Sequence, residues 1–143
     1  MDQVQGFHAV VSTCTASIRE IQDRLAELLD DLEYSDRDRF SVRLAVEEAL
    51  VNALKHGNGR DVDRSIEVHC RVGSELIRVE IVDEGDGFDP SEVESSCEEG
   101  NILTPNGRGL DLMRRFMDRV EFNDTGNRVV LEKSRSDVEI AAV

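Results

Sequence analysis

The chain has 143 residues, of which 39% are hydrophobic, 34% charged and 4% aromatic, a balance typical of one globular domain with an aliphatic core. Its formal net charge of -14 excludes a general nucleic-acid or anionic-membrane binder, because phosphate-rich surfaces are held by an excess of lysine and arginine. The three cysteines have no CxxC spacing, so they indicate neither a disulfide framework nor a zinc site, and we expect reduced thiols. No segment is apolar over a membrane-spanning length, so we expect a cytoplasmic protein.

The first part of the chain predicts a short strand and two helices. Residues 7–12 form a β-prone run, and over residues 18–32 the apolar side chains recur at helical spacing. A second helix is expected to begin at Ser35 or Asp36, because either is a good N-cap, and to end at Gly57.

Two strands and a long loop are expected next. Apolar residues alternate along residues 65–72 and 76–82, which indicates a pair of strands with one buried face. Asp83 falls on that same face by strand phase. Residues 84–106 show almost no hydrophobic periodicity, and long loops inside compact domains are usually functional, so we interpret this stretch as a lid.

The last part of the chain predicts a third helix and a hairpin. Hydrophobic spacing indicates the helix over residues 110–117, and residues 120–122 with 128–131 are expected to pair as strands. From residue 134 onward we expect a loose tail. The elements together predict a single mixed α/β domain over residues 1–143, with its core at about 5–133.

Glu48 and Asn52 form the first candidate constellation. Their spacing of four residues puts both on one face of the second helix, within reach of a single ligand. A carboxylate can activate a hydroxyl, and an amide oxygen can ligate Mg²⁺. The alternative is a solvated glutamate and a tolerated asparagine. Because apolar residues flank both, we expect the helix to be covered on both sides and the two side chains to be partly buried.

The second constellation is the sequence DEGDGF from Asp83 to Phe88. Its glycines, Gly85 and Gly87, permit sharp turns and close approach of a ligand. A carboxylate on the apolar side of a sheet requires a hydrogen-bond partner, and the amino group of a purine is a suitable one. The alternative is a simple turn that ends a strand.

The third constellation is NGRGL, from Asn106 to Leu110, at the start of the third helix. Free N–H groups and the helix dipole can hold phosphates there, and Arg108 can reach a terminal phosphate. The alternative is a glycine-rich helix start with a solvated arginine.

The segments VEEALVNALKHG, VDEGDGF and NGRGL, in this order, resemble the N box and the two glycine boxes of the gyrase, heat-shock chaperone, histidine kinase and MutL (GHKL) superfamily. The resemblance spans about residues 5–133. Within the superfamily, the compact start of strand, helix and helix is similar to the anti-sigma-factor serine kinases of bacterial partner-switching systems. It implies a two-layer α/β sandwich of the Bergerat type, with a mixed, mainly antiparallel sheet and helices on one face.

The resemblance also implies roles for individual residues. Glu48 resembles the general base, Asn52 the Mg²⁺ ligand and Asp83 the carboxylate that reads adenine. Glu47 adjoins Glu48, but only Glu48 has the four-residue spacing to Asn52. Arg108 is also expected to act on the terminal phosphate. The remaining expected contacts to ATP come from the glycine boxes: Gly85, Gly87, Gly107, Arg108, Gly109 and Leu110.

Partners and competing functions follow from the same resemblance. It implies a serine of a small anti-sigma-factor antagonist as substrate, a sigma factor as second partner, and a homodimer. One alternative is the ATP-binding part of a histidine kinase, although such kinases commonly carry Asn where Glu48 stands. A second is a module that binds ATP only to shape a partner surface. A third is an interaction domain without a nucleotide.

Overall fold

The computed structural model describes residues 4–57, 59, 61, 63–85 and 105–136. This part of the chain contains five strands and three α-helices. In chain order they are β1 (Val4–Ser12), α1 (Thr15–Asp31), α2 (Asp36–Asn52), the short π-helix η1 (Ala53–Gly57), β2 (Ser65–Gly73), β3 (Leu76–Asp83), α4 (Pro105–Phe116), β4 (Arg119–Phe122) and β5 (Arg128–Ser134).

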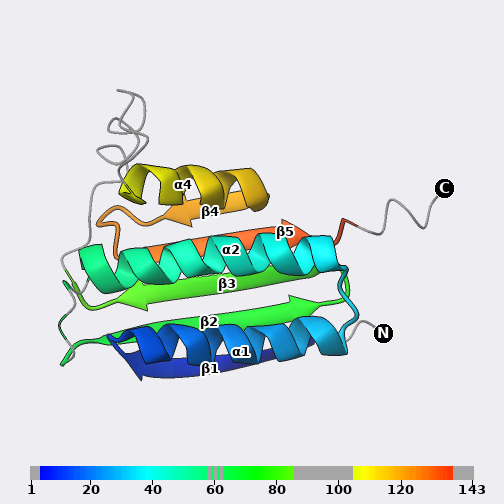
Figure 1. Ribbon diagram of the computed structural model, residues 1–143, viewed down its shortest axis with the longest axis horizontal. Coiled ribbons are helices and arrows are strands. Elements are labelled where there is room, and N and C mark those ends of the chain that lie inside the picture. Colours follow the sequence, from blue (N-terminus) through cyan, green and yellow to red (C-terminus); the bar gives the residue numbers. More distant parts are fainter. Residues whose placement is uncertain (1–3, 58, 60, 62, 86–104, 137–143) are drawn as a thin grey trace.

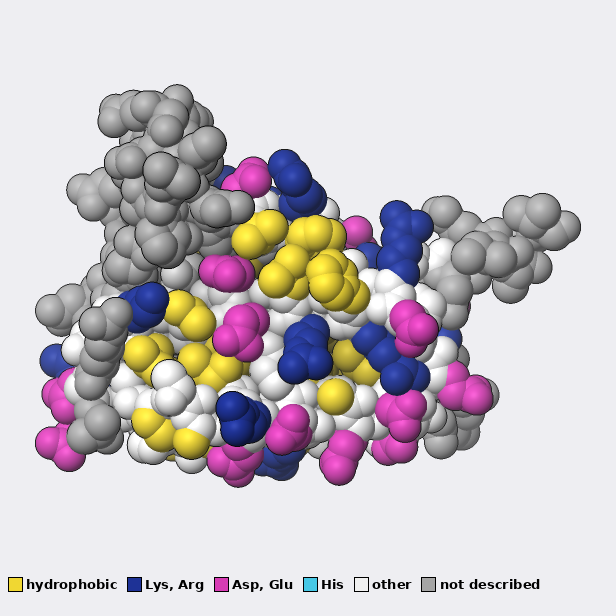
Figure 2. Space-filling model, in the orientation of Figure 1, with side chains coloured by type: hydrophobic (Ala, Val, Ile, Leu, Met, Phe, Trp, Pro, Cys, Tyr) yellow, Lys and Arg dark blue, Asp and Glu magenta, His cyan; other side chains and the backbone are white. Residues whose placement is uncertain are grey.

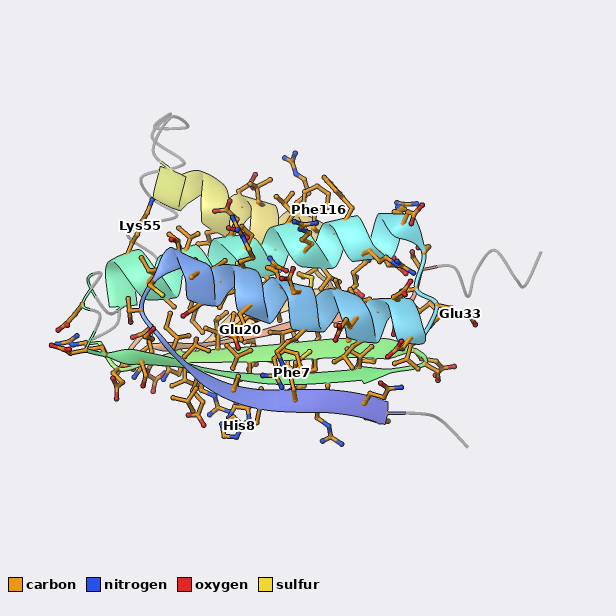
Figure 3. All side chains as sticks on the ribbon, turned by 60° about the horizontal axis from the view of Figure 1, so that its bottom comes forward. Phe7, His8, Glu20, Glu33, Lys55 and Phe116 are labelled. Carbon is orange, nitrogen blue, oxygen red and sulfur yellow. The ribbon has the colours of Figure 1, made fainter. Side chains whose placement is uncertain are left out.

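The strands form one sheet in the order β1-β2-β3-β5-β4. All four described strand pairs are antiparallel. The helices α1, α2 and α4 cover one face of this sheet and leave the other face open (Figures 1 and 3). This two-layer arrangement confirms the predicted α/β fold class.

The core lies between the sheet and the helices. The alternation predicted for β2 and β3 is confirmed, because every apolar residue on the inner face is at most 2% exposed: Ile66, Val68, Cys70, Val72, Ile77, Val79 and Ile81. The helices contribute a matching aliphatic layer, whose most buried members include Ile21, Leu25, Leu29, Val42, Val46, Leu50 and Met113. Aliphatic side chains therefore form the core, as the low aromatic content requires.

The start of α2 is fixed by side-chain hydrogen bonds. Ser35 is the N-cap, and its hydroxyl oxygen accepts a hydrogen bond from the Asp38 N–H at 3.2 Å. Asp38 itself is fully buried, and its carboxylate accepts hydrogen bonds from the backbone N–H of Ser136, at 3.0 Å, and from the Ser136 hydroxyl. Lys133 lies 3.6 Å from the same carboxylate. The buried charge is thus paired, as burial requires.

Arg135 ties the end of the chain to the end of α1. Its guanidinium donates to the carbonyls of Leu32 and Ser74, both at 2.5 Å, and lies 4.0 Å from the centre of the Tyr34 ring. The Leu32 carbonyl at the helix C-cap is therefore satisfied by a side chain. Residues 134–136, which we expected in a loose tail, are held in place by these contacts, while residues 137–143 lie outside the described part.

Two helix ends differ from the sequence expectation. The second helix does not run as an α-helix to Gly57 but changes at Asn52 into the π-helix Ala53–Gly57. Such single π turns are frequent beside functional sites. The third helix begins at Pro105 rather than after Gly109. Proline is favourable in the first turn because the N–H that it lacks would have no partner in the helix.

The two faces of the molecule differ in character. On the helical face, hydrophobic side chains gather over α2 and α4 (Figure 2), where Phe40 is 61% exposed and contacts Phe116 edge to face. The open face of the sheet carries ion pairs instead, such as those of Glu80 with Arg78 and Arg128. None of the described helices is both long and apolar enough to span a membrane.

Candidate functional site

Asn52 is placed by the last turn of α2 and is buried. It is 6% exposed, and its side-chain amide has no hydrogen-bond partner among the described residues. Glu48 lies one turn earlier on the same helix and is partly buried. The burial expected for both residues is confirmed. A buried amide without a partner among the described residues is unusual, and its position suits a ligand, an ion or a water that completes the hydrogen bonding.

The neighbouring glutamates differ in their surroundings. Glu47 faces α1, where one carboxylate oxygen lies 3.3 Å from the side-chain nitrogen of Gln22. Gln22 also donates to the carbonyl of Arg43 at 2.8 Å. Glu47 is therefore engaged in contact between the two helices, and Glu48 is the glutamate that shares the face of Asn52.

Asp83 is placed by the end of β3 and points into the core side of the sheet. It is 6% exposed, and its Oδ1 accepts a hydrogen bond from the Gly85 N–H at 2.9 Å. Burial raises the pKa of Asp83 to about 6, although the Gly85 hydrogen bond and the nearby charge of Arg64 oppose the shift. No hydrogen bond from the described residues reaches Oδ2. This oxygen is thus a buried acceptor available to a ligand.

Asn52 and Asp83 line the same narrow cleft. Its other described walls come from the end of α2, from β3 and from the hairpin of β4 and β5: Ala49, Ala53, Ile81, Phe122, Gly126, Arg128 and Val129. The cavity volume of about 10 Å³ is close to that of a single water position. The described walls therefore form the base of a site, with room for one polar group against Asp83.

The sequence predicted the hairpin of β4 and β5 but not that it lines the cleft. Its turn is held by Asn123, whose side-chain oxygen accepts from the N–H of Asn127 at 3.0 Å and whose amide donates to the Asn127 side chain at 2.6 Å. The backbone N–H of Asp83 donates to the Asn127 carbonyl at 2.9 Å. Gly126 adopts a φ of 77°, which favours glycine. The turn residues thus fix the end of β3. The sequence indicated a turn here but not that the turn would contact Asp83.

The remaining predicted site residues lie at or beyond the edge of the described part. Gly107, Arg108 and Gly109 are in the first turns of α4, where the first N–H groups have no partner within the helix, but their side-chain surroundings are not described. Gly87 and most of the predicted lid, residues 86–104, lie outside the described residues. Leu110 is 2% exposed and packs in the core, so its side chain anchors the helix.

The sequence matches the Histidine kinase-like ATPase domain family over residues 11–133. It is 25% identical over 122 residues to the anti-sigma F factor of Clostridium novyi (strain NT), covering 80% of this chain and 84% of the relative. It is 33% identical over 121 residues to the serine-protein kinase RsbW of Bacillus licheniformis, covering 76% of this chain and 73% of the relative.

A similar fold occurs in a solved structure, that of the RsbU and RsbW domains of a Mycobacterium tuberculosis protein. The TM-score is 0.63 at 16% sequence identity, and the match covers 92% of this chain. This chain spans 32% of that longer chain.

Proposed function

Because the chain belongs to the histidine kinase-like ATPase domain family, we propose that it is an ATP-dependent anti-sigma factor and protein serine kinase. Its substrate would be a serine of an anti-sigma-factor antagonist, and its second partner a sigma factor. Relatives that share 25% and 33% of their residues with it over most of both chains are named anti-sigma F factor and serine-protein kinase. The observation that carries the proposal is the meeting of Asn52 and Asp83, 31 positions apart in sequence, in one cleft.

The described cleft suits the amino group of an adenine base, because it has room for one polar group against Asp83. The Oδ2 atom of Asp83 is a buried acceptor without a described partner, and the exocyclic amino group of adenine is a donor of the required size. The hydrogen bond from Gly85 holds Asp83 in place, so its second oxygen is directed before a ligand arrives. We propose that Asp83 selects adenine in this way.

Asn52 and the start of α4 suit the phosphates. The amide oxygen of Asn52 is a ligand of the kind that Mg²⁺ prefers, and it has no described hydrogen-bond partner. Asn52 would hold a magnesium ion there, and such an ion would supply positive charge against the phosphates. The first N–H groups of α4, which have no partner within the helix, would together with Arg108 supply positive potential for the phosphates in a chain of net charge -14.

Glu48 is the proposed general base. It lies one helical turn from Asn52 on the same face, so a serine hydroxyl aligned with the terminal phosphate would be within its reach. Glu48 then accepts the hydroxyl proton, and Arg108 offsets charge on the transferred group. Phosphoryl transfer of this kind depends mainly on positioning.

Two further parts of the proposal concern the assembly and the place of action. We propose that the chain is a homodimer and acts in the cytoplasm, where a sigma factor would meet it. The main alternative, ATP binding that only shapes a partner surface without transfer, uses the same cleft.

Phosphoryl transfer is the decisive measurement. The full chain is incubated with Mg²⁺, ATP labelled at the γ-phosphate and the cognate antagonist, and labelled phosphoserine is quantified. Glu48→Ala is expected to lose transfer by about 10²–10⁴-fold while retaining ATP binding. Glu47→Ala is the matched control, because its side chain contacts Gln22 of α1, and it should transfer phosphate like the parent. Transfer by Glu48→Ala at the parental rate would refute the assigned base, and ATP binding without any transfer by the parent would favour the alternative.

A further inference from the structure

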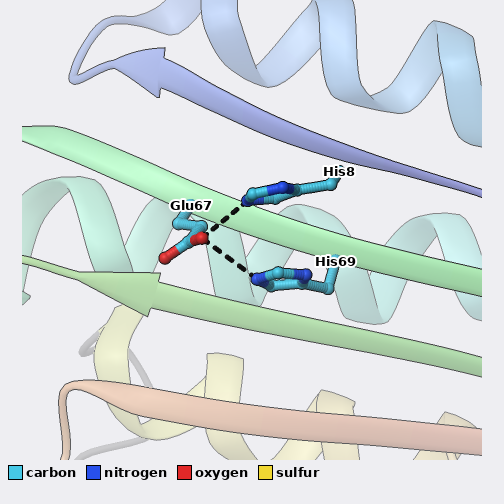
Figure 4. A group of neighbouring side chains, drawn as sticks. All are labelled: His8, Glu67 and His69. Atoms are coloured by element: carbon cyan, nitrogen blue, oxygen red, sulfur yellow. Dashed lines mark hydrogen bonds and ion pairs between the residues drawn. The ribbon is translucent and has the colours of Figure 1, made fainter.

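Three potential metal ligands, His8, Glu67 and His69, gather on the open face of the sheet, on the opposite side from the helices (Figures 3 and 4). The register of β1 and β2 sets His8 directly opposite His69. Glu67 precedes His69 by two residues and therefore projects from the same face. The two imidazole rings are stacked, with centres 4.1 Å apart and planes 9° from parallel. Two of the three histidines of the chain are thus held side by side.

Both rings direct the same nitrogen at one oxygen. Oε2 of Glu67 lies 2.6 Å from Nε2 of His8 and 3.1 Å from Nε2 of His69 (Figure 4). A carboxylate oxygen only accepts hydrogen bonds, so each ring presents a proton to it. The ligand atoms of the three side chains all lie within 4.8 Å of one another. We propose that this cluster binds one divalent transition-metal ion, of the Zn²⁺ type, through the two Nε2 atoms and a carboxylate oxygen of Glu67.

The donor set and spacing suit such an ion. Two imidazoles and one carboxylate are a common ligand set for zinc, whereas Mg²⁺ and Ca²⁺ prefer oxygen ligands alone. Bonds of about 2.0–2.2 Å in tetrahedral geometry place ligand atoms roughly 3.3 Å apart. The two distances to Glu67, 2.6 and 3.1 Å, must therefore lengthen slightly, and no pair of ligand atoms, all now within 4.8 Å, must approach by more than about 1.5 Å. The stacked rings must also tilt, so that both lone pairs point at the ion, and the Nε2 protons leave. A fourth position stays open to water.

The surroundings of the cluster leave it accessible. The side chains of His8, Glu67 and His69 are 52%, 40% and 40% exposed, so an ion can enter directly from solvent. On the side of β3, Glu80 is the register partner of His69, but it is already paired with Arg128 at 2.8 Å. Glu67 is therefore the carboxylate left for the histidines.

The position of the cluster gives binding a structural consequence. The strand β1 is at the edge of the sheet and is joined to it only through β2 within the described strands. An ion held by His8 from β1 and by His69 from β2 would link the two strands. Because the ion binds the folded arrangement, it should raise the melting temperature of the protein. This inference is independent of the proposed kinase activity.

Metal titration of the full chain, prepared without a polyhistidine tag, tests the proposal. ZnCl₂ and CoCl₂ are added in saturating Mg²⁺, which keeps sites for hard ions filled. The parent should bind one ion per chain, and His8→Gln, Glu67→Gln and His69→Gln should each weaken binding at least about tenfold, the loss typical of removing even an outer partner of a metal site. His56→Gln and Cys14→Ser, which remove the third histidine and a partly exposed thiol, are matched controls and should bind like the parent.

A second measurement does not depend on variants that must fold. In the imidazole ¹H–¹⁵N spectrum of the parent, stoichiometric Zn²⁺ should shift the Nε2 resonances of His8 and His69 and spare those of His56. Zinc should also raise the melting temperature of the parent and the controls, but not of the three cluster variants. The absence of a one-to-one site in the parent, unmoved resonances of His8 and His69, or equal affinity in the His69→Gln variant would each overturn the proposal.

Discussion

Asp83→Asn separates the recognition of adenine from the stability of the fold. The asparagine oxygen can keep the hydrogen bond from Gly85, now 2.9 Å long, but its amide nitrogen replaces Oδ2, the acceptor without a described partner. A donor would then face the adenine amino group, also a donor. Leaving a buried polar group unsatisfied costs about 1–3 kcal/mol, which corresponds to a roughly 5- to 150-fold weaker Kd for ATP.

The same substitution should not weaken the unliganded protein. Burial raises the pKa of Asp83 from 3.8 to about 6, so the folded state binds the proton more tightly than the unfolded state does. The ionised carboxylate therefore opposes folding: its unfavourable contribution grows as pH rises from about 4 to about 6 and is fully present above that range. Asparagine removes this contribution, so we expect equal or higher stability of the variant at neutral pH and a flatter pH dependence between 4 and 6.

Calorimetric titration with Mg-ATP and thermal melts from pH 4 to 7 measure both effects. Glu84→Gln is the matched control, because Glu84 is the next residue, is exposed, and is not among the residues lining the cleft. It should bind ATP like the parent. Unchanged ATP affinity in Asp83→Asn would refute the role of Asp83 in reading adenine, and a large loss of stability at neutral pH would contradict the reasoning from its burial.

Three further predictions concern other parts of the molecule. Asn52→Ala should weaken Mg-dependent nucleotide binding itself, measured by calorimetry with and without Mg²⁺; equal affinity would contradict its role as a ligand. Hydrogen bonds lower the pKa of the Cys14 thiol to about 7, whereas burial raises the pKa of the Cys70 thiol to about 12. A maleimide at pH 7 should therefore label Cys14 far faster than Cys70, as measured by peptide mass spectrometry. Equal rates of labelling at the two cysteines would contradict this prediction. Gly6→Ala should destabilise the fold by about 1–3 kcal/mol, because the Cβ of the new alanine would overlap the carbonyl oxygen of Cys70. Urea unfolding measures this loss, and an unchanged unfolding midpoint would contradict the close contact.

Local patterns were enough to predict most of the elements and two residues of the site. The alternation along β2 and β3 has a period of two, so it determined by itself which side of the sheet Asp83 faces. The apolar flanks around Asn52 predicted its burial in the same way, because a helix of period 3.6 fixes which residues share a face. The order of three segments, one N box followed by two glycine boxes, indicated the family.

The tertiary structure decided what depends on contacts between distant segments. The place of β5 between β3 and β4 brings Phe122 and Arg128 to the cleft, and no local pattern sets strand order. The register of β1 against β2 likewise puts His8 beside His69, which are 61 positions apart, because strand pairing is chosen by the packing of the whole sheet. Periodicity along the chain reports which way a side chain faces, whereas its partners across the sheet are determined only when the sheet assembles.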